Sequence, residues 1–369
     1  MSVVKEGWTY KNFEECLVKA PKAKQVQTSE YNSGTRYPIV SQEDKLVSGY
    51  CDDSSLLYHI DNPVVIFGDH TRVLKYVDFD FVVGADGVKI LIPKEFLNAK
   101  FLFFYLQWYN IPSLGYSRHY KLLKEISIPV PPLPSQQSIV SELDKINELI
   151  ALKKSQLKDL DTLAQSIFYE MFGDPITNEK EWEVKKYSDC FTIGSGGTPS
   201  KSVPDYWDNG TIPWIGSNMC QNSVITETDG KFITEEGLRH SSAKMLEEGT
   251  VLVALVGATI GKVALLRTKT STNQNIAFIK VNETKEFVSE YVFFHLMNQY
   301  NEFMLIGNGD FKMASQAFIK ALNIMVPPFS LQHQFAERVE AIERLKQEVQ
   351  TAIKDLETLL ASRMQYWFE

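Results

Sequence analysis

The residues of this chain that could support chemistry lie in glycine-rich and polar loops. Residues 257–263 read Gly-Ala-Thr-Ile-Gly-Lys-Val and follow an apolar run, so they look like a phosphate-binding loop. Only three residues separate the two glycines, where such a loop has four, and Val263 stands where the magnesium-binding hydroxyl belongs. We therefore expect a tight hairpin, with Lys262 facing a phosphate backbone.

Other apparent motifs also fail as catalytic sites. Residues 194–201 are glycine-rich but lack the dinucleotide-binding pattern, so they read as a flexible loop or an anion-binding one. Residues 326–329, Val-Pro-Pro-Phe, look like the turn of amino-methyltransferases, but Val326 cannot hydrogen-bond a target amine, and we interpret them as a helix entry. The six histidines and four cysteines show no metal-ligand spacing. The sequence predicts no catalytic residues, no metal site and no cofactor in this chain.

Short amides, hydroxyls and basic residues on the loops instead fit the reading of DNA base edges. Asn and Gln pair with adenine, Arg and Lys with guanine, and Ser and Thr donate or accept. Each loop by itself is equally well explained as a solvated turn. The run Arg118-His119 and its neighbours belong to this set. We predict these DNA-binding residues: Ser41, Gln42, His70, Thr71, Arg72, Arg118, Lys121, Lys201, Ser217, Asn218, Thr259, Lys262, Asn273, Gln274, Asn275, Lys312, Ser315 and Gln316.

Composition limits the ways in which this chain could bind DNA. Its net charge is −8, which argues against a protein that coats nucleic acid. The acidic excess falls after residue 130, so local patches or partner subunits must neutralise phosphates. The cysteines read as reduced thiols in a cytoplasmic protein. The polar start of the chain predicts no secretory signal, and the apolar runs are too short for a membrane span.

The elements that position these loops occur twice. Residues 128–137 and 324–332 each contain a Pro-Pro step followed by Gln, and Pro131 and Pro327 stand 196 positions apart. The same offset relates apolar residues up to Phe172 and Phe368. Such self-similarity predicts a duplicated structure. The heads before each step read as mixed domains, with short β-rich runs broken by Gly and polar turns, so we expect an α+β fold.

A long helix follows each Pro-Pro step. The expected apolar stripes have the spacing of a coiled-coil seam, with Lys153 and Lys346 interrupting them. One such helix cannot stand alone in water, so we expect the two to pair, antiparallel because a head lies between them in the chain. The alternative is that each helix packs on its own head. The stripes are Leu143, Ile146, Ile150, Leu157, Leu160, Ala164, Ile167 and Met171, then Val339, Ile342, Val349, Ile353, Leu356 and Leu360.

These features resemble a known family. Residues 196–200 read Gly-Gly-Thr-Pro-Ser, Tyr206-Trp207 follow, and residues 212–215 read Ile-Pro-Trp-Ile. Together with the two Pro-Pro-x-x-x-Gln steps and the Met-Phe-Gly-Asp-Pro exit at 171–175, they resemble the specificity subunit of type I restriction–modification enzymes. The resemblance covers essentially the whole chain. It implies target recognition domains at residues 1–130 (the first head) and 173–328 (the second head), with spacer helices at 131–172 and 329–369.

The resemblance also implies a function. Each head would read one half of a bipartite site in double-stranded DNA, and the helices would set the gap and dock two methyltransferase subunits. Those subunits would carry S-adenosylmethionine, and restriction subunits would add ATP- and Mg-dependent cleavage, leaving this chain non-catalytic. The alternatives are a type IIB-like or methylation-only system, or a two-headed adaptor that binds proteins. Methyl transfer by the isolated chain would favour an enzyme.

Overall fold

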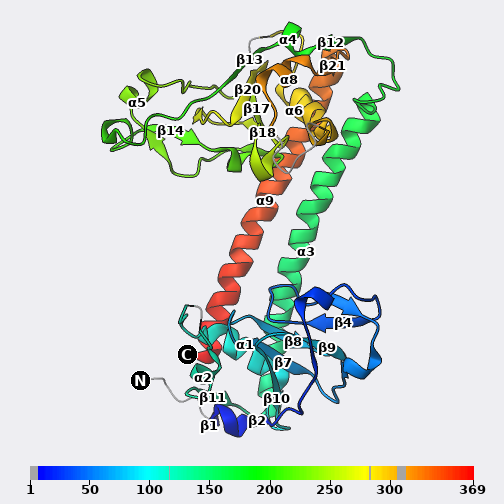
Figure 1. Ribbon diagram of the computed structural model, residues 1–369, viewed down its shortest axis with the longest axis vertical. Coiled ribbons are helices and arrows are strands. Elements are labelled where there is room, and N and C mark those ends of the chain that lie inside the picture. Colours follow the sequence, from blue (N-terminus) through cyan, green and yellow to red (C-terminus); the bar gives the residue numbers. More distant parts are fainter. Residues whose placement is uncertain (1–6, 116, 282–283, 306–312) are drawn as a thin grey trace. The chain divides into compact units, whose positions relative to one another are not determined.

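The structure, a computed structural model, describes residues 7–115, 117–281, 284–305 and 313–369 (Figure 1). The chain forms two compact units. Unit 1 consists of Met1–Ser155 with Gln350–Glu369, and unit 2 consists of Gln156–Val349. Each unit therefore contains one head and parts of both long helices, α3 (Leu133–Phe172) and α9 (Phe329–Phe368).

Unit 1 is built from short strands with two helices besides its parts of α3 and α9. The strands are β1 (Thr9–Asn12), β2 (Leu17–Val18), β3 (Gln25–Val26), β4 (Tyr37–Val40), β5 (Gly49–Cys51), β6 (Leu57–Tyr58), β7 (Val64–Gly68), β8 (Leu74–Val77), β9 (Phe81–Gly84), β10 (Val88–Pro93) and β11 (Ser127–Val130). The helices are α1 (Ala99–Tyr109) and α2 (Tyr120–Leu123), with 3-10 helices at Phe13–Cys16, Thr28–Glu30 and Ser54–Leu56.

Three sheets make up the first head. Their strand orders are β2-β10-β7-β8, β3-β9-β4-β5 with β6 beside β9, and β1-β11. The central strand β7 is buried on both faces because it has apolar residues at every position. Val65 and Phe67 belong to the core with α1, whereas Val64 and Ile66 pack with residues of β9, as alternation along a strand requires.

Unit 2 repeats this plan, and part of it forms an arm. Its strands are β12 (Val184–Lys186), β13 (Thr192–Ser195), β14 (Ile212–Ile215), β15 (Ser223–Ile225), β16 (Phe232–Ile233), β17 (Thr250–Ala254), β18 (Val263–Leu266), β19 (Ser271–Thr272), β20 (Ile276–Lys280) and β21 (Asn323–Met325). Its helices are α4 (Tyr187–Cys190), α5 (Glu235–Arg239), α6 (Ser289–Asn298), α7 (Tyr300–Met304) and α8 (Gln316–Ala321), with 3-10 helices at Pro204–Tyr206, Ser217–Met219 and Gly257–Thr259. The arm around β14, β16 and α5 extends beside the β17–β20 sheet (Figure 1).

Strand pairing confirms the internal repeat. The antiparallel pairs β1·β11, β2·β10, β7·β10 and β7·β8 of the first head reappear as β12·β21, β13·β20, β17·β20 and β17·β18 in the second. The parallel pair β4·β9 reappears as β14·β19. Helix α1 packs on β7 and β8 as α6 packs on β17 and β18. The fold is therefore α+β, with two related heads and two long helices.

The two helices pair antiparallel within each unit. In unit 1, Lys154 Nζ lies 2.9 Å from Glu357 Oε1, and Arg363 forms a two-pronged ion pair with Glu142. In unit 2, Lys346, which the sequence places inside an apolar stripe, lies 2.8 Å from Asp161 Oδ1. In every pair one residue number rises as the other falls, as antiparallel pairing requires.

The end of each stripe differs from the prediction. Ile167 and Met171 are only half-buried, and the fully buried residues of the last turns are Phe168 and Phe172. A straight helix with 3.6 residues per turn drifts away from a strict heptad, so its buried face moves to the following positions. There Phe172 packs against Tyr291 and Phe335, and at the repeat-related position Phe368 packs against Phe101.

The Gln of each Pro-Pro step is a buried hook. Gln136 Nε2 donates to the carbonyl oxygens of Phe96 (2.9 Å) and Pro131 (2.7 Å), and its Oε1 accepts from the N–H of Asn98 (2.7 Å). Asn98 is the N-cap of α1. The hook therefore joins the start of α3 to the start of α1.

The second head repeats the hook with Gln332. Its Nε2 donates to Glu286 and Pro327 at 3.0 Å each, and its Oε1 accepts from the N–H of Val288, the N-cap of α6, at 3.0 Å. Both glutamines are fully buried. Only the amide of Gln or Asn can donate twice and accept at one buried position.

The four cysteines are free thiols. Among the described residues, no helix is both long and apolar enough to span a membrane. Within the same residues, no cluster of three or more His, Cys, Asp or Glu side chains is arranged to hold a metal ion.

Candidate nucleic-acid interface

In the first head, the β7–β8 turn and the loop after β4 meet. Thr71 Oγ1 donates to the carbonyl of Gln42 (2.7 Å), and the N–H of His70 donates to Gln42 Oε1 (3.2 Å). Arg72 closes the turn in the left-handed region at φ 64°, and its Nη1 donates to the carbonyl of Ile111 (2.8 Å). Four of the predicted DNA-binding residues therefore lie in one cluster, which we call the first polar cluster: Gln42, His70, Thr71 and Arg72.

Two glycines permit this close approach. A Cβ on Gly68 would lie 2.3 Å from Thr71 Oγ1, and a Cβ on Gly87 would lie 2.8 Å from the ring of His70. Gly87 also has φ 83°, which disfavours other residues. The β9–β10 turn thereby contributes bare backbone beside the cluster.

Buried Asp69 and His119 fix the segment that carries Arg118 and Lys121. His119 Nδ1 and N–H both bond the carbonyl of Asp69 (3.0 and 2.8 Å), and His119 Nε2 accepts from Leu114. Asp69 Oδ1 accepts from the N–H of Tyr120 at 2.8 Å. Arg118 and Lys121 remain exposed on either side of this anchor. Of the run Arg118-His119, the structure thus offers only the arginine to a ligand.

Ser41 does not belong to the exposed surface. Its side chain is 1% exposed, and its hydroxyl lies 2.6 Å from Ser48 Oγ and accepts from the N–H of Glu43. Its hydroxyl holds the loop after β4, so the structure does not place this predicted DNA-binding residue at the surface. Sequence reasoning also missed Lys75, a buried residue whose Nζ donates to the Lys45 carbonyl in the same loop. Burial lowers the pKa of Lys75.

In the second head, three loops meet around Asn273. The N–H of Asn273 donates to the Ile215 carbonyl (3.1 Å), and Asn273 Oδ1 accepts from the N–H of Asn275 (3.0 Å). Exposed Gln274 accepts a hydrogen bond from Thr198 Oγ1, in the Gly-Gly-Thr-Pro-Ser loop. Thr198 was not among the predicted DNA-binding residues, although its loop stands out in the sequence.

Gln316 and the turn after β14 complete this group. Gln316 Nε2 donates to Ser195 Oγ at 2.7 Å. Asn218 is exposed, and its Oδ1 would lie 2.7 Å from a Cβ on Gly216, where Asn273 Nδ2 is also near. Half-buried Ser217 begins the same turn. The second polar cluster therefore consists of Thr198, Ser217, Asn218, Asn273, Gln274, Asn275 and Gln316.

The remaining predicted residues of the second head have other surroundings. Ser315 is the N-cap of α8 and accepts from Phe318 N–H at 3.1 Å, so its hydroxyl already serves the helix. Lys201 is exposed in the turn before Pro204–Tyr206, and no hydrogen bond among the described residues ties it to the cluster. Lys312 lies outside the described residues.

The structure confirms the hairpin predicted at residues 257–263. Strands β17 and β18 pair antiparallel on either side, so a strand follows Lys262 where a phosphate-binding loop requires a helix. Half-buried Thr259 closes the turn through its carbonyl, which accepts from the Lys262 N–H at 2.9 Å. Lys262 Nζ donates to Gln221 Oε1 at 2.7 Å.

Both clusters use the loop that follows an equivalent strand, β4 in the first head and β14 in the second. The first cluster is completed by the β7–β8 turn, with the β9–β10 turn beside it, and the second by the β19–β20 turn. In each head a later segment also bonds the residue that follows the equivalent central strand: the N–H of His119 donates to the carbonyl of Asp69 after β7, and the N–H of Ala314 donates to the carbonyl of Leu255 after β17. The scaffold is shared and the side chains differ.

Comparison with known proteins identifies this scaffold. The model of the type I restriction modification DNA specificity domain matches residues 5–161 and again residues 179–357. The chain belongs to this family. It carries two copies of a DNA specificity domain and is a DNA-recognition chain of the type I restriction–modification kind.

Individual relatives agree with this assignment. The type I restriction enzyme EcoR124I/EcoR124II specificity subunit of Escherichia coli is 28% identical over 278 residues, covering 70% of this chain and 67% of that protein. The MjaIX specificity subunit of Methanocaldococcus jannaschii is 26% identical over 194 residues, covering 51% and 44%. The matches thus span about half to two thirds of these relatives.

Solved structures support the fold. The S subunit of a type I restriction–modification system from M. genitalium superposes with a TM-score of 0.60 at 14% identity, covering all of this chain and 98% of that one. A chain from a study of complex assembly and conformational transition of the type I R-M system gives 0.58 at 16% identity, covering 100% and 99%.

Proposed function

We propose that this specificity chain reads a bipartite site in double-stranded DNA, one half with each polar cluster. The observation that carries the proposal is the doubled scaffold with unlike loops. The first polar cluster offers an imidazole, an amide, a hydroxyl and a guanidinium, whereas the second offers mainly amides. Amides favour adenine and guanidinium groups favour guanine, so the two heads should select different base sequences.

Side chains already held by neighbours are suited to this task. Gln42, Thr71 and Asn273 each have at least one hydrogen bond within their own cluster. A side chain fixed before binding loses less conformational entropy when it meets a base. The loops are therefore pre-arranged for base contacts.

The chain itself is proposed to be non-catalytic and to act in the cytoplasm. Two methyltransferase subunits that use S-adenosylmethionine would dock on it, and restriction subunits that use ATP and Mg would complete a cleaving complex. The paired parts of α3 and α9 would set the gap between the half-sites. What supports these partners is the family membership.

The test is methylation mapping. The chain is co-expressed with its cognate methyltransferase subunit in a host that lacks other restriction–modification systems, and modified bases are mapped by sequencing. We expect one split motif, with two defined halves and a gap of fixed length. A continuous motif would contradict two-headed reading, and DNA-independent capture of another protein would favour the adaptor. Cleavage on both sides of the motif would assign a type IIB-like system.

A further inference from the structure

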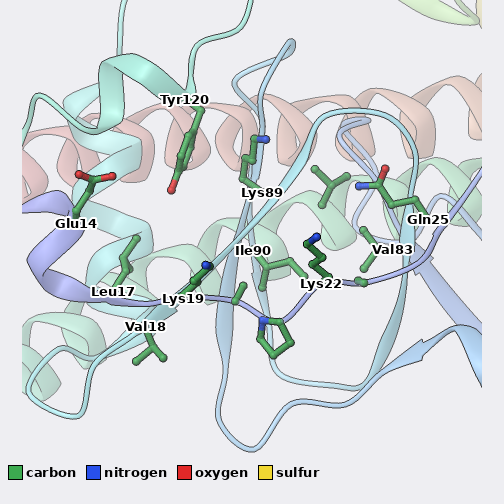
Figure 2. A pocket seen from close by; sticks show the side chains of 14 residues that line it. Glu14, Leu17, Val18, Lys19, Lys22, Gln25, Val83, Lys89, Ile90 and Tyr120 are labelled. Carbon is green, nitrogen blue, oxygen red and sulfur yellow. The ribbon is translucent and has the colours of Figure 1, made fainter.

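A groove of about 540 Å³ opens in unit 1, outside the first polar cluster (Figure 2). One wall is the segment that joins β2 to β3, and the other includes residues of β9 and β10. Val83, Val88 and Ile90 give it an apolar lining. Lys19, Lys22 and Lys89 lie along it, between Glu14 and Gln25 (Figure 2).

Among the described residues, two lysines of the groove have no acidic partner. Residues 18–24 contain three lysines and no acid. Lys19 and Lys22 are exposed, and within the part of the chain that the structure describes neither forms an ion pair. Glu14 is the one acidic side chain among the lining residues, and its Oε1 lies 2.6 Å from Lys124 Nζ.

The groove is continuous with the first polar cluster. Lys89 Nζ lies 3.7 Å from Asp69 Oδ2 and 5.6 Å from the ring centre of Tyr120. Lys89 and Tyr120 line the groove, and Asp69 immediately precedes His70 of the cluster. A DNA duplex that places a base edge at His70 would therefore have the neighbouring nucleotides beside the groove.

We propose that this groove binds the phosphodiester backbone of the DNA next to the bases that the first head reads, with Lys19 and Lys22 as phosphate contacts. Free, exposed ammonium groups attract phosphates and release counterions from DNA. An apolar lining between the lysines suits the sugars that separate successive phosphates. Such contacts fix the register of a protein on the duplex and carry no sequence information. The inference rests on the proposed function.

The test uses the chain assembled with its methyltransferase partner. Lys19→Gln and Lys22→Gln are combined, and affinity for the mapped site is measured at several salt concentrations. Lys89 is kept because it pairs with buried Asp69. The plot of log K against log salt has a negative slope, and each lost phosphate contact makes it less steep by about 0.9. The double variant should therefore reduce the steepness by about 1.8. Cognate and single-base-variant sites should weaken by the same factor.

The matched control removes the same charge elsewhere. Lys285→Gln with Lys354→Gln changes two exposed lysines outside the groove and should leave the slope unchanged. Phosphate ethylation interference should be lost next to the first half-site only in the groove variant. Wild-type binding with an unchanged slope in the Lys19/Lys22 variant would overturn this inference alone. A wild-type complex that binds no DNA would overturn the proposed function with it. Loss of subunit assembly in the Lys19/Lys22 variant would assign the groove to a protein partner and overturn the inference.

Discussion

Replacing the buried Gln in the first turn of α3 or of α9 should strongly destabilise the head that it anchors. In Gln332→Leu the side-chain volume is nearly kept, but the N–H of Val288 and the carbonyls of Glu286 and Pro327 lose their partners. Leaving a buried polar group unsatisfied costs about 1–3 kcal/mol, so three such groups should cost roughly 3 kcal/mol or more. That is a large part of the 5–15 kcal/mol that holds a typical domain together.

The repeat supplies a second, independent measurement. Gln136→Leu removes the same three bonds in the first head and should cost a similar amount. Exposed neighbours give matched controls: Gln137→Leu and Gln334→Leu make the same chemical change at the surface and should stay within about 0.5 kcal/mol. Gln332→Glu can still accept from the N–H of Val288, but an ionised carboxylate cannot donate to the two carbonyls. This variant should therefore be least stable at pH values where its carboxylate is ionised.

The assay is urea unfolding followed by circular dichroism, with hydrogen exchange to locate the loss. We expect faster exchange at the start of α1 in Gln136→Leu and at the start of α6 in Gln332→Leu. A loss below about 1 kcal/mol relative to the surface controls would refute the hook. Equal exchange changes at both helices in either single variant would also refute it.

Three further outcomes are expected. Burial lowers the pKa of His295 to about 3, so below pH 6.5 the unfolded chain takes up a proton that the folded chain does not. The free energy of unfolding should therefore fall by up to about 1.4 kcal/mol for each pH unit of acidification. Urea unfolding at several pH values should show that His295→Gln loses this pH dependence. Asn273→Ala or Gln274→Ala should relax selectivity at particular bases by roughly 1–3 kcal/mol, and equal weakening of all single-base variants in competition binding would remove the case for base reading. Adding four residues after Ser155 and four after Val349, at the unit boundary in both helices, should change the gap between the methylated half-sites but not the sequence of either half. An unchanged gap in methylation mapping would contradict the proposal that the paired helices set its length.

Periodicity predicted the elements that repeat. The fixed offset between the Pro-Pro steps predicted two related heads, and both Gln residues stand out in the sequence. Two of the three partners of each hook lie about 40 residues before the Gln, in segments of no regular pattern, so its role could be recognised only from the fold. The apolar stripes predicted two helices but missed Phe168 and Phe172, because the buried face of a straight helix drifts from the heptad positions and the drift is greatest in the last turns.

The polar loops were harder to predict. Most candidates at strand ends do converge, because adjacent strands bring their loops to one place. Ser41 and His119 turn inward instead, and nothing in the local sequence distinguishes an exposed hydroxyl or imidazole from one that satisfies buried backbone groups. Asp69, Lys75 and Thr198 were missed because their hydrogen-bond partners lie in distant segments of the chain, which the local sequence does not reveal.

The hydrogen bonds of each polar cluster stay within its own unit, which is why changes in one head should leave the other unaffected. The first head is not complete at residue 130, however. Its core includes Met364 and Phe368 from the far end of the chain, and its hook is Gln136. If residues 1–130 alone were exchanged, the new head would have to pack against Phe368 and hydrogen-bond to Gln136 of the original chain. The unit that keeps this core and its hook together is therefore Met1–Ser155 with Gln350–Glu369. New specificities should arise most readily by changing loops within a head, because those changes leave the hook and the aromatic core intact.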